Sequence, residues 1–422
     1  DAWFPSRHRP PKVSWAHAEK GAGYAWQSEC DHARWALLRR TYSKRQLLER
    51  MTEFWLNHLH VYGHTDLAWM WRTGYDQVIR KHALGKFDAM LKAAIPHPTM
   101  VLYLDADMSQ AGEINENLGR ELLELHTVGR EAGYTEAMVQ DSARILTGYY
   151  VDRFKSWKYS YIESRHATGS VRVLGFSHQN SDPDGRPMLM EYLDYLAHHP
   201  ATAQRIARKL AARFVSDDPS QTLVDHLADV FQQTGTDITA TLRALIEHPE
   251  FKNSAGKKVK TPSEDVVSTL RAYGVKLKRP HRDADASNSI FYVCRLVGQV
   301  PFGWGPPNGF PDTANVWTSP GRMMGSYHVH YSLAGGWWPN TGVEYRRHAS
   351  WLPQKRIRFD QFVDHLCRVL HGRGATPLVL GAACIATDMT PGTLLTASHY
   401  MIQSRLPKLL GILLDTPQFL TR

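Results

Sequence analysis

The polar stretch at residues 113–128 carries the densest set of groups that could do chemistry. On a helix with ~100° per residue, its leucines fall on one face and its polar groups on the other. The apolar face would hold Leu118, Leu122 and Leu125. The polar face would hold Glu113, Glu116, Asn117, Arg120, Glu121, Glu124 and Thr127. Asparagine mixed with carboxylates and an arginine suits helix propensity poorly but is usual in a polar pocket, so this face is the first candidate site.

Glu121 and Glu124 are the carboxylates in this stretch whose spacing suits acid and base catalysis. Residues at i and i+3 of a helix have Cβ atoms ~5–6 Å apart, which allows the short carboxyl separation of retaining glycosidases. Arg120 would hold one carboxylate ionised, and the other, in a drier position, would act as the acid. Asp105 could instead supply the opposing carboxylate of an inverting pair, whereas Asp107 is better explained as a turn residue.

The same stretch also fits the solvated face of an ordinary amphipathic helix. Glu116, Arg120 and Glu124 stand at successive i,i+4 positions, where ion pairs stabilise an exposed helix. The two interpretations differ in burial, because a site needs this face to border a cavity, while a solvated face lies open to water.

A second group of candidates follows a helix predicted from about residue 43. His58 falls on its apolar face, where a histidine satisfied within the core is the commoner outcome. A buried histidine beside Asn57 would also serve as an acid/base or substrate-orienting pair. His60, His64 and Asp66 could converge on a metal only in an irregular loop, and no Glu-x-x-His motif supports such a site.

Thirteen tryptophans are a heavy load for a chain of 422 residues. Some suit the filling of a wide helical core, but Trp304 and Trp317 fall in irregular segments, where flat apolar faces could line a ligand groove. Pyranose rings suit such faces. Together with the carboxylates, asparagine and arginine, these tryptophans favour a saccharide site.

Composition excludes several other classes of protein. The net charge is +9, but the basic residues are scattered and no nucleic-acid motif is present. The longest apolar runs are far shorter than the ~20 residues of a membrane-spanning helix. The four cysteines are widely spaced without a CxxC pair, and the serine-hydrolase, phosphate-loop and dinucleotide-binding motifs are missing.

The elements that must position these residues are predicted to be mainly α-helical. Apolar residues recur at three- and four-residue spacing in four regions, which indicates one compact multi-helical domain. Its predicted parts are an N-terminal arm (1–42), a helical part with the motifs (43–147), a small antiparallel β insertion (148–178), a helical layer (188–275), a Pro/Gly/aromatic-rich loop region (300–345) and C-terminal helices (350–422). Within the loop region, residues 300–339 are expected to be too irregular for a helix.

Short motifs run in order along the chain from about residue 40. They are YSKRQL (42–47), FWLNH (54–58), VIRKHALG (78–85), NENLGRELLELHTVG (115–129), GYTE (133–136), LTGY (146–149), HPATA (199–203), RKL (208–210), PEF (249–251) and PPNGFP (306–311). In these the chain resembles the DUF1800 family, exported bacterial proteins of unknown function that are often encoded beside a sulfatase-like family. The resemblance therefore implies export. His60 and Asp107 depart from it, since similar sequences commonly have asparagine at both positions.

Residues and resemblance together favour an exported enzyme that cleaves a polysaccharide, including an acidic one, as a glycoside hydrolase or, on a uronate, as a polysaccharide lyase. Catalysis would fall to Glu121, Glu124, Asp105 and His58, and substrate binding to Asn57, Asn117, Arg120, Glu116, Trp304 and Trp317. No cofactor, metal, nucleic acid or transmembrane segment is expected. The alternatives are a non-catalytic envelope or secretion partner of a sulfatase-like protein, and a metal-dependent enzyme using His60, His64 and Asp66.

Overall fold

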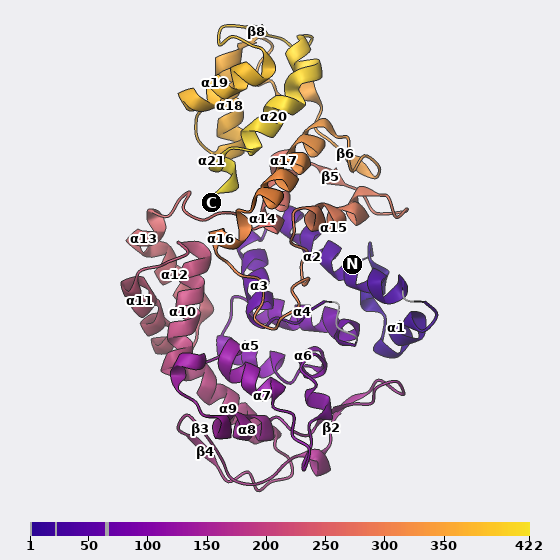
Figure 1. Ribbon diagram of the computed structural model, residues 1–422, viewed down its shortest axis with the longest axis vertical. Helices are drawn as coiled ribbons and strands as arrows, with labels where there is room; N and C mark the ends of the chain where they lie inside the picture. The colour runs from indigo at the N-terminus through magenta and orange to yellow at the C-terminus, as the bar shows by residue number, and fades with distance from the viewer. Residues whose placement is uncertain (1, 22, 64–66) are drawn as a thin grey trace. The chain divides into compact units, whose positions relative to one another are not determined.

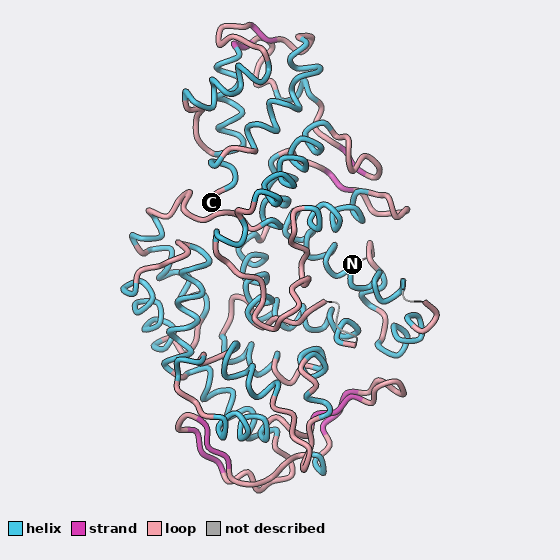
Figure 2. The backbone as a smooth tube through the Cα atoms, viewed as in Figure 1, coloured by secondary structure: helices cyan, strands magenta, loops and turns pink. Residues whose placement is uncertain are grey.

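The computed structural model describes residues 2–21, 23–63 and 67–422 (Figure 1). Among these residues helix dominates, and the strands form four separate two-stranded antiparallel pairs (Figure 2). The prediction of a mainly α fold is confirmed. The chain divides into two compact units, of which unit 1 comprises Asp1–His32, Lys44–Ser254 and Phe302–Pro311, and unit 2 comprises Ala33–Ser43, Ala255–Pro301 and Asp312–Arg422.

Unit 1 contains the whole polar stretch at residues 113–128. Its helices are α1 (Pro11–Ala18), the first part of α2 (Gly23–Tyr42), α3 (Gln46–His58), α4 (Arg72–His82), α5 (Phe87–Ala94), α6 (Pro98–Tyr103), α7 (Asn117–Glu121), α8 (Glu136–Ile145), α9 (Arg186–His198), α10 (Pro200–Phe214), α11 (Gln221–Gln233), α12 (Ile238–Glu247) and α13 (Pro249–Lys252). Leucine, isoleucine, valine and alanine side chains on the inner faces of these helices are almost fully buried.

Histidine–proline pairs begin three helices of unit 1. His97, His199 and His248 precede the first residues of α6, α10 and α13, and each ring accepts a hydrogen bond from the backbone N–H two residues later. Proline then occupies the first helical position, where its fixed φ suits the helix and its missing N–H costs nothing. These pairs explain why the helical layer is cut into short pieces at 199–200 and 248–249.

Helix α7 passes directly into a π-helical segment, Leu122–His126. Close packing fixes its approach to α8, because a Cβ on Gly119 would lie 2.6 Å from the backbone nitrogen of Ala143. The Ser142 hydroxyl of α8 also donates to the Gly119 carbonyl at 3.1 Å. Single π turns are rare in proteins as a whole, and those that occur are frequently found at functional sites.

The strand content of unit 1 lies within the predicted insertion at 148–178. Strands β1 (Tyr149–Val151) and β2 (Tyr159–Tyr161) pair with Tyr149 opposite Tyr161, and β3 (Val171–Val173) and β4 (Phe176–His178) form a second hairpin. Val171 and Val173 are fully buried while Arg172 between them is exposed, as alternation predicts. Unit 2 adds only two-residue pairs, β5 (Lys276–Leu277) with β6 (Val343–Glu344) and β7 (Ile357–Arg358) with β8 (Leu394–Leu395).

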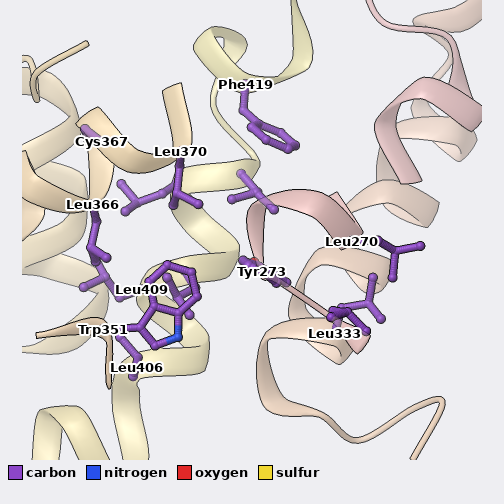
Figure 3. Packing of buried hydrophobic residues seen from close by; sticks show 14 of the residues in the cluster. Leu270, Tyr273, Leu333, Trp351, Leu366, Cys367, Leu370, Leu406, Leu409 and Phe419 are labelled. Carbon is purple, nitrogen blue, oxygen red and sulfur yellow. The ribbon is translucent and has the colours of Figure 1, made fainter. Parts of the chain in front are cut away.

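Unit 2 is built around one apolar cluster, part of which Figure 3 shows. Its helices are the second part of α2, α14 (Pro262–Ala272), α15 (Ala286–Leu296), α16 (Ala314–Trp317), α17 (Pro320–Gly335), α18 (Phe359–His371), α19 (Pro377–Thr387), α20 (Leu406–Leu414) and α21 (Pro417–Leu420). Trp351, Leu366 and Leu409 are buried in the cluster. The full burial of such side chains provides most of the favourable free energy of folding.

The prediction that residues 300–339 are too irregular for helix is wrong for α17, which spans 16 residues. The buried face of α17 is polar, so the sequence lacks the apolar periodicity of a core helix. Arg322, Ser326 and His330 all reach the buried carboxylate of Asp265 on α14, at 3.3, 2.7 and 3.0 Å. His330 also bonds Asp415.

The N-terminal arm predicted at 1–42 is also more regular than expected, because α1 and α2 cover most of it. In the second part of α2 the buried face includes Ala33, Leu37 and Thr41. Small and polar residues on an inner face give a weak pattern, which explains why the helix was missed. None of the helices in the described ranges is long and apolar enough to cross a membrane.

The close contact at Gly119 leads to a prediction about stability. We expect Gly119→Ala to lower the free energy of unfolding by about 1–3 kcal/mol, because the added methyl group meets the backbone of α8. Gly321→Ala on α17 is the control, since no atom lies within 4 Å of a Cβ there. Thermal unfolding of the two variants measures the difference, and equal melting temperatures would show that α7 and α8 do not approach this closely.

Candidate functional site

Glu121 ends α7 and lies half-buried where the helix passes into the π segment. Burial and the neighbouring charge of Glu124 raise the pKa of its carboxyl, against the opposing effect of Arg120 and Arg130. Within the described ranges no hydrogen bond or ion pair engages this carboxyl group. Glu121 is therefore the carboxyl group of the stretch best suited to hold a proton, as a general acid must.

Glu124, in the π segment, is paired with a cation that the sequence did not suggest. Its carboxylate lies 2.7 Å from Nε of Arg130. Arg120 instead pairs with Glu116 at 3.0 Å and with Glu136 at 2.6 Å. The expected Arg120–Glu124 pair does not form in the described structure, because the wider π turn moves Glu124 off the i+4 position of an α-helix. Arg130, not Arg120, makes the contact with the second carboxylate.

Tyr103 connects the carboxylates with the aromatic loop at residues 302–311. Its hydroxyl donates to the backbone carbonyl of Gly305 at 2.9 Å. Burial and the charge of Glu121 raise the pKa of Tyr103 to about 12, so the phenol stays protonated. Trp304, next to Gly305, packs against Phe310 with ring centroids 5.3 Å apart. Tyr103 thus contacts the loop at Gly305, next to Trp304, and is close enough to Glu121 to feel its charge.

Asn57 holds the same loop from the opposite side. Its amide nitrogen donates to the carbonyl of Phe310 at 2.9 Å, and its amide oxygen accepts from the N–H of Phe310 at 2.8 Å. A Cβ on Gly309, where φ is +74°, would lie 2.2 Å from the Asn57 carbonyl, so only glycine permits this approach. Asn57 is therefore engaged in positioning the loop.

Two further side chains fix the start of the loop. His60 is buried, and its Nε2 donates to the carbonyl of Trp304 at 2.7 Å. The guanidinium of Arg72 lies 3.8 Å from the ring centroid of Phe302. Burial lowers the pKa of His60 to about 4, so the ring is neutral at physiological pH. His60 thus supports Trp304 through its backbone.

His58 and His126 form a reciprocal pair between the end of α3 and the end of the π segment. His58 Nε2 donates to the carbonyl of His126 at 3.0 Å, and His126 Nδ1 donates to the carbonyl of His58 at 3.1 Å. Because a carbonyl can only accept, both tautomers are fixed. His58 Nδ1 then accepts from Nζ of Lys209 at 3.0 Å, whereas His126 Nε2 is buried with no partner in the described structure.

Lys209 stands beside Arg205, one turn earlier on α10. Arg205 donates to the carbonyl of Leu125 at 3.4 Å and is attracted by Glu124 and Glu131. Burial and the charge of Arg205 lower the pKa of Lys209 to about 7. A lysine whose pKa is lowered this far by burial and a second cation is a candidate functional residue.

Asp105 and Asp107 serve a different part of the unit. Both oxygens of the fully buried Asp107 accept from Arg153 at 2.5 Å, and Asp105, half exposed, lies 3.2 Å from the same guanidinium. Arg153 follows β1, so this ion pair ties the β insertion to the segment before α7. Asp107, predicted as a turn residue, is therefore the buried partner of Arg153. The left-handed backbone conformation is found at Asp105 instead, with φ of 52°.

The remaining predicted residues are dispersed. Asn117 is exposed, and Trp317 is buried in unit 2. Of the predicted apolar face, Leu118 and Leu122 are buried and Leu125 is partly exposed. His64 and Asp66 lie outside the described residues, and no group of three or more potential metal ligands occurs within them.

Sequence reasoning missed Tyr103, His126, Arg130, Arg205 and Lys209. The one available signal was the like-charged pair Arg205 and Lys209 at i,i+4, which is unfavourable on a helix surface and therefore informative. His126 and Arg130 follow Glu124 closely in the sequence, but their partners there depend on the π turn and on α3, and Tyr103 comes close to Glu121 only through tertiary packing.

The low pKa of Lys209 predicts a particular dependence of stability on pH. The unfolded chain, with the usual pKa of 10.5, binds the proton more tightly than the folded chain with about 7. Wild-type stability should therefore rise with pH between these values. We expect Lys209→Met to raise the melting temperature below pH 7 and to lose this advantage towards pH 10.5. Scanning calorimetry against Lys252→Met, an exposed control on α13, tests this, and a destabilised Lys209→Met would contradict it.

A family model described as "Protein of unknown function (DUF1800)" matches residues 12–421. It covers nearly all of both units, including every residue of the candidate site described above. No curated protein and no solved structure matches the chain. The agreement over nearly the whole length shows that this protein belongs to the DUF1800 family.

Proposed function

We propose that this protein cleaves a polysaccharide, with Glu121 as the proton donor and Glu124 as the second carboxylate. The observation that carries the proposal is the difference between the two groups. Glu121 has a raised pKa and no partner in the described ranges, and Glu124 is ion-paired with Arg130. Two nearby carboxyl groups in unlike environments are the usual arrangement for acid and base roles at one site.

In the proposed hydrolysis, Glu121 gives its proton to the glycosidic oxygen as the bond to the anomeric carbon breaks. Glu124 then either attacks that carbon or removes a proton from the attacking water. The positive charge that develops on the sugar ring is stabilised by the negative Glu124. On a uronate, elimination would instead need a base to take the proton beside the carboxylate group.

The loop at 302–311 supplies a surface for a sugar ring. Trp304 is partly exposed, and its indole N–H donates to Asn308 at 2.8 Å, which fixes the ring plane. Tyr103 holds the loop next to Glu121 through Gly305. Aromatic faces near a carboxylate pair suit pyranose rings. Export is part of this proposal and depends on the family resemblance alone.

A second candidate function is that of a non-catalytic partner for another envelope protein, such as a sulfatase-like one. It is favoured by α19 in unit 2, where Leu378 and Ile385 are 83% and 86% exposed. Apolar side chains exposed to this degree are typical of contact surfaces. The described structure does not support a metal-dependent reaction through His60, His64 and Asp66, because Nε2 of His60 is hydrogen-bonded to the carbonyl of Trp304.

The test is incubation of the protein with a panel of neutral and acidic bacterial polysaccharides. On a polymer that is cleaved, Glu121→Gln should lower kcat by about 10²- to 10⁴-fold, because it keeps volume and removes proton transfer. The control is Glu191→Gln, exposed on α9 of the same unit, which should keep wild-type activity. An equally active Glu121→Gln, or no cleavage of any polymer, would remove the proposal.

The electrostatic link between the two carboxylates gives a further prediction. The charge of Glu124 raises the pKa of Glu121, so Glu124→Gln should lower that pKa. Carboxyl ¹³C chemical shifts against pH measure this directly, without any substrate. Glu191→Gln should leave the titration of Glu121 unchanged. If the Glu124→Gln titration is also unchanged, the two groups do not form one site.

A further inference from the structure

Two cations of α10, Arg205 and Lys209, contact the segment that carries Glu124 and the end of α3. Arg205 contacts the carbonyl of Leu125, directly after Glu124, and Lys209 contacts His58. Both side chains remain partly exposed to solvent. A Cβ on Gly129, which follows the π segment with φ of +81°, would lie 2.8 Å from a terminal nitrogen of Arg205, so glycine lets the chain pass close over the guanidinium.

These cations have more donors than the protein has acceptors for them. The Nε of Arg205 is buried without a partner in the described structure. Nζ of Lys209 has one protein contact, the Nδ1 of His58, and no carboxylate of the described chain acts on it. Glu124 and Glu131 attract Arg205, but their charges do not extend to Lys209. Two like charges at i,i+4 are unfavourable unless something neutralises them.

We propose that Lys209 and Arg205 form a subsite for an oxyanion, the carboxylate or sulfate group of an acidic glycan. The glycan part of this inference rests on the proposed function, whereas the oxyanion part stands on the two cations alone. Ammonium and guanidinium groups form charge-assisted hydrogen bonds with such anions. Because the charge of Glu124 acts on Arg205, an acidic sugar held here would have its neighbouring linkage close to the two carboxylates.

The charges around Lys209 give the subsite a defined pH dependence. The groups facing it are His58 from α3, His126 from the π segment and Arg205 from its own helix. Burial lowers the pKa of both histidines far below neutrality, so neither titrates near pH 7. Lys209, with a pKa of about 7, does. An anion favours the ammonium form, so affinity should fall as pH rises above 7, and binding at pH 8 should take up protons.

The experiment is isothermal titration calorimetry at constant ionic strength with three probes, sodium sulfate, sodium glucuronate and glucose. Sulfate or glucuronate should bind saturably and neutral glucose should not, and the tighter of the two anions identifies the group preferred. Titrations at pH 8 in Tris and in triethanolamine should differ in heat, because their ionisation enthalpies differ and protons are taken up. Equal heats in the two buffers would contradict the role of Lys209.

The matched variants are Lys209→Met and Arg208→Met. Arg208 is the next residue of α10, but it is exposed and bonds Gln221 instead. Lys209→Met should weaken anion binding by about 10- to 100-fold, as expected for a lost charged hydrogen bond, and Arg208→Met should not. Equal affinities in the two variants, or no saturable anion binding to the wild type, would overturn the inference. If the protein cleaves a polymer in a reaction that needs Glu121 but binds no anion, only this inference is removed. If it binds an anion but cleaves no polymer, only the proposed function is removed.

Discussion

His58 and His126 each donate a ring N–H to the backbone carbonyl of the other, at 3.0 and 3.1 Å. This exchange joins the last residue of α3 to the last residue of the π segment, and both rings are almost completely buried. Because a buried carbonyl at a helix end must find a donor, the pair satisfies groups that would otherwise destabilise the fold. The positions of Glu124, Arg205 and Lys209 all depend on it, since each contacts one of the two segments that it joins.

The π segment also separates opposite charges. Glu121 and Glu124 lie on the side of Arg130 and Tyr103, and Lys209 lies on the side of His58. An α-helix of this sequence would have placed Glu124 one turn from Arg120, where the two would neutralise each other. The extra residue of the π turn leaves Glu121 without a cation in contact, and burial together with the charge of Glu124 raises the pKa of its carboxyl.

Unit 2 solves a related problem in another way. Asp265 is buried in the interior, but it accepts from Arg322, Ser326 and His330 on a single helix. Although burial disfavours the imidazolium, Asp265 and Asp415 raise the pKa of His330 to about 9, so the ring is charged at neutral pH. A buried network in which both carboxylate oxygens of Asp265 and both ring nitrogens of His330 have partners costs little, whereas loss of one member leaves a buried charge. Lys209 differs from this network, because its one protein contact in the described structure is the neutral ring of His58.

The sequence alone determined the fold class and the β insertion at 148–178, because helical and strand periodicity act locally. It also singled out Glu121 and Glu124, whose types and spacing are local. It did not determine the partner of Glu124, the helix α17 or the placement of Trp304. Arg130 replaced Arg120 because a π turn changed the angle between residues, and α17 escaped notice because its buried face is largely polar and finds its partners, Asp265 and Asp415, only in the folded chain. Tertiary structure alone brought Lys209 to His58 and Tyr103 to Gly305, since contacts between residues 151 and 202 positions apart leave no periodic trace in the chain.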